Sequence, residues 1–160
     1  MRRLLLTGAT GFIGRRCLSA LLPGEFEVHA VSSAPQPPGA GVRQWHQADL
    51  LIPGASTRLV QEVRPTHVLH LAWVATPGEF WTSPLNLAWV QGSIELLRAF
   101  ADTEGERFVG AGSCAEYATS ETDCDERVTP LRPSTLYGSA KHAFQTLLEG
   151  YSRGRLSSAW

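Results

Sequence analysis

Residues 5–16 read LLTGATGFIGRR, and this short stretch is the clearest indication of the fold. The apolar run over 3–7 predicts a strand that leads directly into three glycines spaced three apart. Those glycines are Gly8, Gly11 and Gly14. Apolar residues at helical spacing then predict a helix over 12–22. The stretch therefore indicates a strand, a tight glycine turn and a helix in immediate succession.

Each glycine has a physical role in such a turn. Gly8 permits the tight turn, Gly11 lets the backbone approach a diphosphate, and Gly14 allows the helix to pack closely on the strand. A phosphate group can then meet the free N–H groups at the start of the helix. The spacing is G-x-x-G-x-x-G rather than G-x-G-x-x-G, and a glycine-rich turn without a ligand is the alternative.

The rest of the chain alternates strands and helices in the same way. Further strands are expected over 26–32, 42–47, 67–73 and 107–111, helices over 56–63, 86–101 and 134–151, and a loop over 34–41. This alternation predicts an α/β fold, a doubly wound parallel sheet with helices on both faces. Its ligand crevice is expected beyond the carboxyl ends of the strands.

Composition places the chain among folded domains. It has 160 residues, 43% of them hydrophobic and 18% charged, which predicts one domain over 1–160. The formal net charge of -1 does not favour a nucleic-acid or membrane partner, and no apolar run is long enough to span a bilayer. We expect a cytoplasmic protein. The odd number of cysteines, without C-x-x-C spacing, and the scattered histidines suggest neither disulfides nor a metal site.

The sequence TGATGFIG resembles the extended short-chain dehydrogenase/reductase superfamily, in its branch of NAD-dependent nucleotide-sugar epimerases, dehydratases and reductases. Further marks of that branch follow in the family's order along the whole chain. They are Asp49-Leu50, HLAW at 70–73, Asn86 with GSIELL at 92–97, GSCAEY at 112–117 and YGSAK at 137–141. Each mark is weak alone, and together they are strong.

The resemblance implies a Rossmann fold that covers about the first half of a family member. The last residues, 155–160, are then expected to run into the sixth strand, with the later strands and a smaller substrate domain absent. The family also dimerises through two long helices, so a homodimer is expected through the helices that start near Asn86 and Ser134.

Three residues are candidates for catalysis. Tyr137 and Lys141 are four apart on a predicted helix and therefore share a face. A free tyrosine, with a pKa of about 10, needs a nearby positive charge to act as a base near neutral pH. The resemblance implies a triad in which Tyr137 moves a proton, Lys141 supports it and holds the cofactor ribose, and Ser113 orients the substrate. Chance spacing of the tyrosine and lysine is the alternative.

The family pattern also implies the cofactor contacts. They are Gly8, Gly11, Phe12, Ile13, Gly14, Arg15, Ser32, Ser33, Asp49, Leu50, Leu71, Ala72, Trp73, Tyr137 and Lys141. Ser32 stands where an acid would hold the ribose 2′-hydroxyl of NAD, and Arg15 or Arg16 could bind a 2′-phosphate. This combination favours NADP(H), with NAD(H) as the alternative. A solvated helix face is the other interpretation of the arginines.

Residues around the triad bear on the reaction. Cys114-Ala115 replaces the Asp-Glu pair of the family's 4,6-dehydratases, which disfavours dehydration. Glu116 is expected to be a solvated carboxylate at the rim, with a contact to substrate as the alternative. Trp73, Phe80, Trp81 and Trp89 are expected near the nicotinamide, either stacking on a ligand or packing locally. We therefore expect a nucleotide-sugar 4-ketoreductase or epimerase. A non-catalytic NAD(P)-binding module, serving as a redox sensor or interaction domain, is the alternative.

Overall fold

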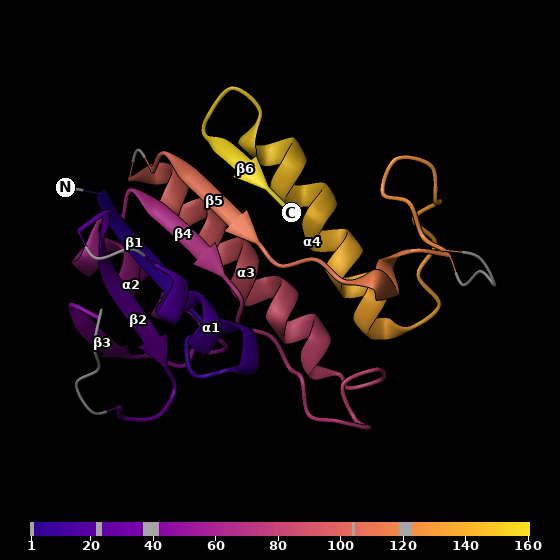
Figure 1. The fold of residues 1–160 in the computed structure, drawn as a ribbon, viewed down its shortest axis with the longest axis horizontal. Coiled ribbons are helices and arrows are strands. Elements are labelled where there is room, and N and C mark those ends of the chain that lie inside the picture. The colour runs from indigo at the N-terminus through magenta and orange to yellow at the C-terminus, as the bar shows by residue number, and fades with distance from the viewer. Residues whose placement is uncertain (1, 22–23, 37–41, 104, 119–122) are drawn as a thin grey trace.

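The computed structural model describes residues 2–21, 24–36, 42–103, 105–118 and 123–160. Within them, a parallel sheet of six strands has the order β3-β2-β1-β4-β5-β6 (Figure 1). The strands are β1 (Arg2–Thr7), β2 (Phe26–Ser32), β3 (Gln44–Gln47), β4 (His67–His70), β5 (Arg107–Gly110) and β6 (Ser157–Ala159). The helices are α1 (Phe12–Ala20), α2 (Ala55–Val63), α3 (Leu85–Asp102), the 3-10 helix η1 (Cys114–Glu116) and α4 (Leu136–Ser152).

The strand order reverses between β1 and β4. The chain first builds outward from β1 through β2 to β3, and then crosses back to place β4, β5 and β6 on the other side of β1. Such a switch point leaves a crevice beyond the carboxyl ends of the two central strands. The predicted doubly wound parallel sheet is confirmed, and so is the expectation that the last residues enter a sixth strand.

Alternate side chains of β1 enter two different cores. Leu5 belongs to a large cluster with residues of α2, α3 and α4, which pack side by side on one face of the sheet. Leu6 belongs to a smaller cluster, against which Leu18 of α1 packs on the opposite face. Figure 1 shows α1 in front of the sheet and α3 behind it. Both faces of the central strands are therefore covered, as their nearly continuous apolar sequence predicts.

Several element boundaries differ from those predicted. The fourth strand ends at His70 rather than at residue 73, because the Ala72 N–H donates to the Thr7 hydroxyl oxygen at 3.2 Å instead of to a sheet carbonyl. The third strand begins at Gln44, and α1 ends before Leu21, whose backbone is extended. Residues 37–41 of the predicted loop and the end of the predicted first helix lie outside the described residues.

Candidate functional site

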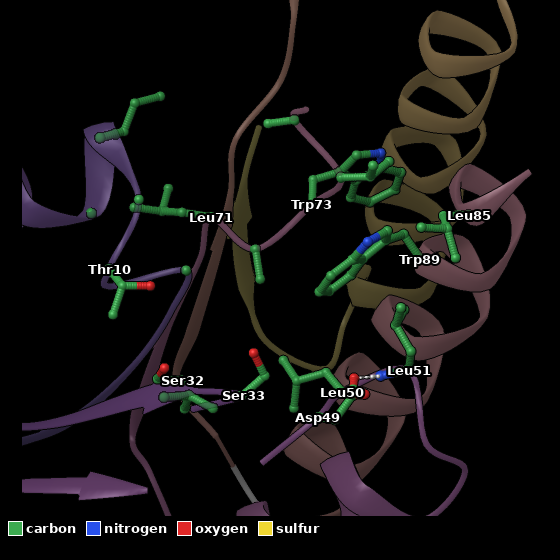
Figure 2. Close-up of a pocket in the computed structure, with 18 of the residues that line it drawn as sticks. Thr10, Ser32, Ser33, Asp49, Leu50, Leu51, Leu71, Trp73, Leu85 and Trp89 are labelled. Atoms are coloured by element: carbon green, nitrogen blue, oxygen red, sulfur yellow. Dashed lines mark hydrogen bonds between the residues drawn. The ribbon is translucent and has the colours of Figure 1, made fainter. Parts of the chain in front are cut away.

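A cleft of about 670 Å³ lies at the carboxyl edge of the sheet, where the predicted crevice is expected. It is formed by the turn after β1, the ends of β2 and β3, and the segment after β4 (Figure 2). All the residues predicted to contact a cofactor line it except Arg15, Tyr137 and Lys141. Residues from four separate strand ends, which the sequence places far apart, thus converge on one space.

The glycine turn forms one end of the cleft. Gly8 has a φ of 69°, and a Cβ on it would lie 2.6 Å from the backbone nitrogen of Ala72. A Cβ on Gly14 would collide with the carbonyl oxygen of Gly8 and lie 2.7 Å from the Ala9 Cα. Gly11 differs, because its Cβ would be 3.2 Å from the nearest backbone atom, the Gly8 oxygen, and its φ of -72° suits any residue. Two glycines are therefore required by the fold, while Gly11 leaves space on the cleft side.

The ends of β2 and β3 form the floor of the cleft. Ser32 is buried and its hydroxyl accepts the Ala34 N–H at 3.2 Å, whereas Ser33 is exposed. Asp49 follows β3, and its Oδ1 accepts the Leu51 N–H at 3.0 Å, as the dashed line in Figure 2 shows. No carboxylate stands at the tip of β2. This arrangement suits the hydroxyl groups of a nucleoside, because it offers both hydroxyl donors and a carboxylate acceptor.

The two arginines after the glycine turn lie outside the cleft. Arg15 and Arg16 are both exposed on α1, and neither is among the residues that line the cleft. Ser32 and Ser33, by contrast, both line the cleft. The predicted contact of the arginines with a 2′-phosphate therefore stays a prediction, and a solvated helix face describes their position in this structure.

Two tryptophans form the other end of the cleft. The Trp73 and Trp89 rings stack with centroids 6.1 Å apart, and Figure 2 shows both opposite the glycine turn. The Trp73 indole N–H donates to Asn86 Oδ1 at 2.9 Å. Both rings also pack against the large core, so local packing and lining of the cleft are combined in the same side chains.

Asn86 holds the loop between β4 and α3, which carries Trp73. Its side chain is fully buried, and its Nδ2 donates to the carbonyl oxygens of Phe80 at 2.7 Å and Ser83 at 2.8 Å. With the Trp73 bond, each polar atom of the amide is satisfied. The asparagine therefore fixes the loop between β4 and α3, a role that the sequence reasoning did not assign to it.

Lys141 packs against the ring of Trp73. Its side chain is buried, its Nζ donates to the Ala111 carbonyl oxygen at 2.9 Å, and the Trp73 ring centroid is 4.1 Å from Nζ. Burial lowers the pKa of Lys141 to about 8, and the carboxylate of Glu116 acts in the opposite direction. Trp73 thus lies against the predicted catalytic lysine while also lining the cleft.

Tyr137 lies in the first turn of α4, among aromatic side chains of the loop between β4 and α3. Its ring meets the Phe80 ring at 4.8 Å and the Trp81 ring at 5.8 Å, both edge to face. Its backbone N–H donates to the Trp81 carbonyl oxygen at 3.1 Å. The sequence did not predict this contact between Tyr137 and the two aromatic rings, and Tyr137 does not line the cleft.

Ser113 lies on a second cavity, of about 640 Å³, which Glu116 and Trp160 also line. Its hydroxyl accepts the Ala115 N–H at 3.2 Å and caps η1. The three predicted catalytic residues are therefore divided. Ser113 faces the second cavity, whereas Tyr137 and Lys141 lie near the aromatic end of the first. Packing of η1 against α4 connects the two groups.

The expectation of a solvated carboxylate at Glu116 is wrong, because this side chain is buried and the residue is only 2% exposed. Its Oε1 accepts the Ser113 N–H, which completes a capping box around η1. Burial raises the pKa of Glu116, while the bonds from Ser113 and Trp160 act in the opposite direction. The S-x-x-E pattern over 113–116 could have indicated this cap, because it is typical of such an arrangement.

Metal and membrane features are absent from the described ranges. They contain no group of three or more His, Cys, Asp or Glu side chains arranged to hold a metal ion. Within the same ranges, every helix is too short or too polar to cross a membrane.

Comparison with known proteins gives a consistent result. The sequence model of the "NAD dependent epimerase/dehydratase family" matches residues 4–158. The probable UDP-arabinose 4-epimerase 1 of Oryza sativa subsp. japonica is 26% identical in an alignment of 165 positions, gaps included, that covers 94% of this chain and 39% of the relative. The chain therefore spans about two-fifths of that relative's length.

Solved structures agree in fold. The Thermus thermophilus UDP-glucose 4-epimerase in complex with NAD is 28% identical with a TM-score of 0.81, over 98% of this chain and 53% of the other. The Bordetella bronchiseptica enzyme WbmG in complex with NAD and UDP is 25% identical with a TM-score of 0.76, over 92% and 49% respectively. The match thus covers nearly all of this chain and about half of each solved chain.

Proposed function

Because the chain belongs to the NAD dependent epimerase/dehydratase family, we propose that its cleft binds a nicotinamide dinucleotide and that the protein acts on a nucleotide sugar. The observation that carries this proposal is the cleft itself, where the glycine turn, Ser32, Asp49 and Trp73 meet. The room beside Gly11 fits a diphosphate approaching the start of α1.

The chemistry is proposed to be 4-epimerisation or reduction of a 4-keto sugar. A bound nicotinamide would supply or accept hydride. Tyr137 would take or give the proton at the sugar oxygen, and Ser113 would hold that oxygen by a hydrogen bond. The ammonium of Lys141, one turn further along α4, would hold the ribose of the dinucleotide. Both reactions need the same three residues, and relatives that include UDP-sugar 4-epimerases support this substrate class.

The dinucleotide is proposed to be either NAD(H) or NADP(H). The comparisons give no support for the preference for NADP(H) expected from the sequence, because the solved relatives described above hold NAD. Hydroxyls of Ser32 and Ser33, rather than a carboxylate, stand at the tip of β2. A 2′-phosphate therefore meets no carboxylate from β2, although Asp49 lies after β3 on the same floor, and both dinucleotides are expected to bind.

Assembly and location are further proposals. A homodimer through α3 and α4 is supported by apolar side chains exposed on these helices, Leu87 at 59% and Leu147 at 47%. The cytoplasm is proposed because the three cysteines are free, which suits a reducing compartment.

A second candidate function is a dinucleotide-binding module without turnover. The observation that favours it is the separation of Ser113, on the second cavity, from the cofactor residues of the first. Tyr137 and Lys141 are likewise absent from the lining of the first cavity. Turnover tests distinguish the two functions.

We expect Tyr137→Phe to lower the turnover of a keto-sugar nucleotide by about 10²- to 10⁴-fold, because it removes the hydroxyl that transfers the proton. Dinucleotide binding should change by no more than about twofold, since the ring and its contacts with Phe80 and Trp81 remain. Reduction is followed by NAD(P)H absorbance, and epimerisation by chromatography of the sugar nucleotides. Tyr151→Phe, on the same helix, is the matched control and should retain wild-type turnover. Unchanged turnover in Tyr137→Phe would contradict the triad, and a wild-type protein that binds dinucleotide without turnover would be the non-catalytic module.

A further inference from the structure

The carboxylate of Glu116 joins the ends of two neighbouring strands. It lies on η1, the next element after β5, and accepts the Ser113 N–H at 2.6 Å. The indole N–H of Trp160, directly after β6, is 3.1 Å from Oε1 and 3.0 Å from Oε2. A carboxylate that is 2% exposed and takes bonds from both strand ends is a built feature of this edge of the sheet.

Trp160 connects this carboxylate to the predicted catalytic lysine. Its ring centroid lies 5.3 Å from Lys141 Nζ, while its N–H points to Glu116. The same ammonium donates to the carbonyl oxygen of Ala111, two residues before Ser113. Glu116, Ser113 and Lys141 are thus held on one short framework formed by the segment after β5, the segment after β6 and α4.

The charges of neighbouring groups affect the protonation of Lys141. Glu116 from η1 and His70 from β4 are the titratable groups that interact electrostatically with Lys141, and Tyr137 and His142 lie on the same helix as the lysine. His70 is neutral near pH 7, because burial lowers its pKa to about 3. Glu116 is therefore the group among these that favours the charged form of Lys141, and it offsets part of the cost of burying the ammonium.

We propose that Glu116 is a positioning residue of the Ser113–Tyr137–Lys141 site, whose buried carboxylate fixes Ser113 and supplies the counter-charge that keeps Lys141 protonated. The catalytic consequence of this inference rests on the proposed function, whereas the charge relation does not. Without the carboxylate, Lys141 loses its proton at a lower pH, and the site loses its positive charge with it.

The sequence makes a direct test possible, because Lys141 is the only lysine in the 160 residues. In protein labelled with 13C at lysine Cε, a single resonance reports its titration between pH 6 and pH 10, with no cofactor or substrate present. The wild-type midpoint should lie near 8. Glu116→Gln keeps the carbonyl acceptor for Ser113 but removes the charge, so the midpoint should fall by about one unit.

Two further variants complete the experiment. Glu126→Gln removes a carboxylate from the exposed rim of the same cavity and should leave the lysine midpoint at the wild-type value. Glu116→Asp keeps the charge and should bring the midpoint back toward that of the wild type. Urea unfolding verifies that each variant is folded. Trp160 and the C-terminal residues are unchanged in all of the variants.

The proposal is overturned if Glu116→Gln leaves the midpoint unchanged, or if Glu126→Gln or Glu116→Asp lowers it by as much. If the proposed function fails, the wild type binds no dinucleotide in a separate measurement. The lysine titration needs no ligand, so its predicted midpoints would still be observed. Where turnover is present, Glu116→Gln should also move the alkaline limb of the pH–rate profile downward by the same amount, a change that a purely structural role would not produce.

Discussion

Valine in place of Gly14 is expected to prevent stable folding of the domain. Its Cβ would collide with the carbonyl oxygen of Gly8 and approach the Ala9 Cα to 2.7 Å. Both obstacles are backbone atoms, so no side-chain rotation relieves them. The helix α1 would have to move away from β1, which should cost about 4 kcal/mol or more in the free energy of unfolding.

Urea unfolding followed by circular dichroism measures this effect. The matched control is Gly150→Ala in α4, where a Cβ meets no atom within 4 Å. Alanine should stabilise that exposed helical position by up to about 1 kcal/mol. A Gly14→Val protein as stable as the wild type would show that α1 is not packed on β1 as the structure describes.

The second large effect is acid destabilisation through His70. Its ring is 3% exposed, with Nδ1 2.7 Å from the Thr7 hydroxyl and Nε2 2.8 Å from the Ser93 hydroxyl. Burial, and then the charge of Lys141, lowers the pKa of His70 to about 3 from 6.5. The unfolded chain therefore takes up a proton near pH 6.5, whereas the folded protein does so only near pH 3.

Because of this difference in proton uptake, the free energy of unfolding falls as the pH is lowered. The stabilisation is fully present above pH 6.5 and is lost as the pH falls toward 3. The loss should be about 2 kcal/mol between pH 6.5 and pH 5, and about 5 kcal/mol over the whole interval. Urea unfolding at pH 7 and pH 5 should show a smaller loss for His70→Asn than for the wild type. His67→Asn, at the start of the same strand, should retain the wild-type dependence, and an equal pH dependence in His70→Asn would contradict the assignment.

The part of the site that the sequence predicted well depends on local geometry. Gly8 and Gly14 stand where any Cβ meets backbone, so their positions in the sequence report the turn directly. The strand ends then follow from the alternation of elements, because parallel strands bring their carboxyl ends to one edge. Ser32, Asp49 and Trp73 therefore reach the cleft as predicted.

The part that the sequence did not predict depends on contacts between distant segments. Helical spacing correctly predicts that Tyr137 and Lys141 share α4, but the aromatic loop after β4 determines what their face meets. The burial of Glu116 depends on Trp160, 44 residues away, whose position is set by pairing of β6 with β5. No local pattern encodes that contact, although the capping box around Ser113 does indicate that Glu116 turns back toward its own backbone.

The most direct test of the central claim is titration of the folded protein with NADH and with NADPH, followed by tryptophan fluorescence, in the wild type and in Gly11→Val. Gly11 already has an extended backbone, and its Cβ needs only a shift of a few tenths of an ångström from the Gly8 oxygen, so Gly11→Val should still fold. We expect saturable binding of both dinucleotides to the wild type. Binding to Gly11→Val should be at least about tenfold weaker, because the valine side chain fills the space needed by the diphosphate. Wild-type protein that binds neither dinucleotide, or a folded Gly11→Val protein that binds them as tightly as the wild type, would contradict this expectation.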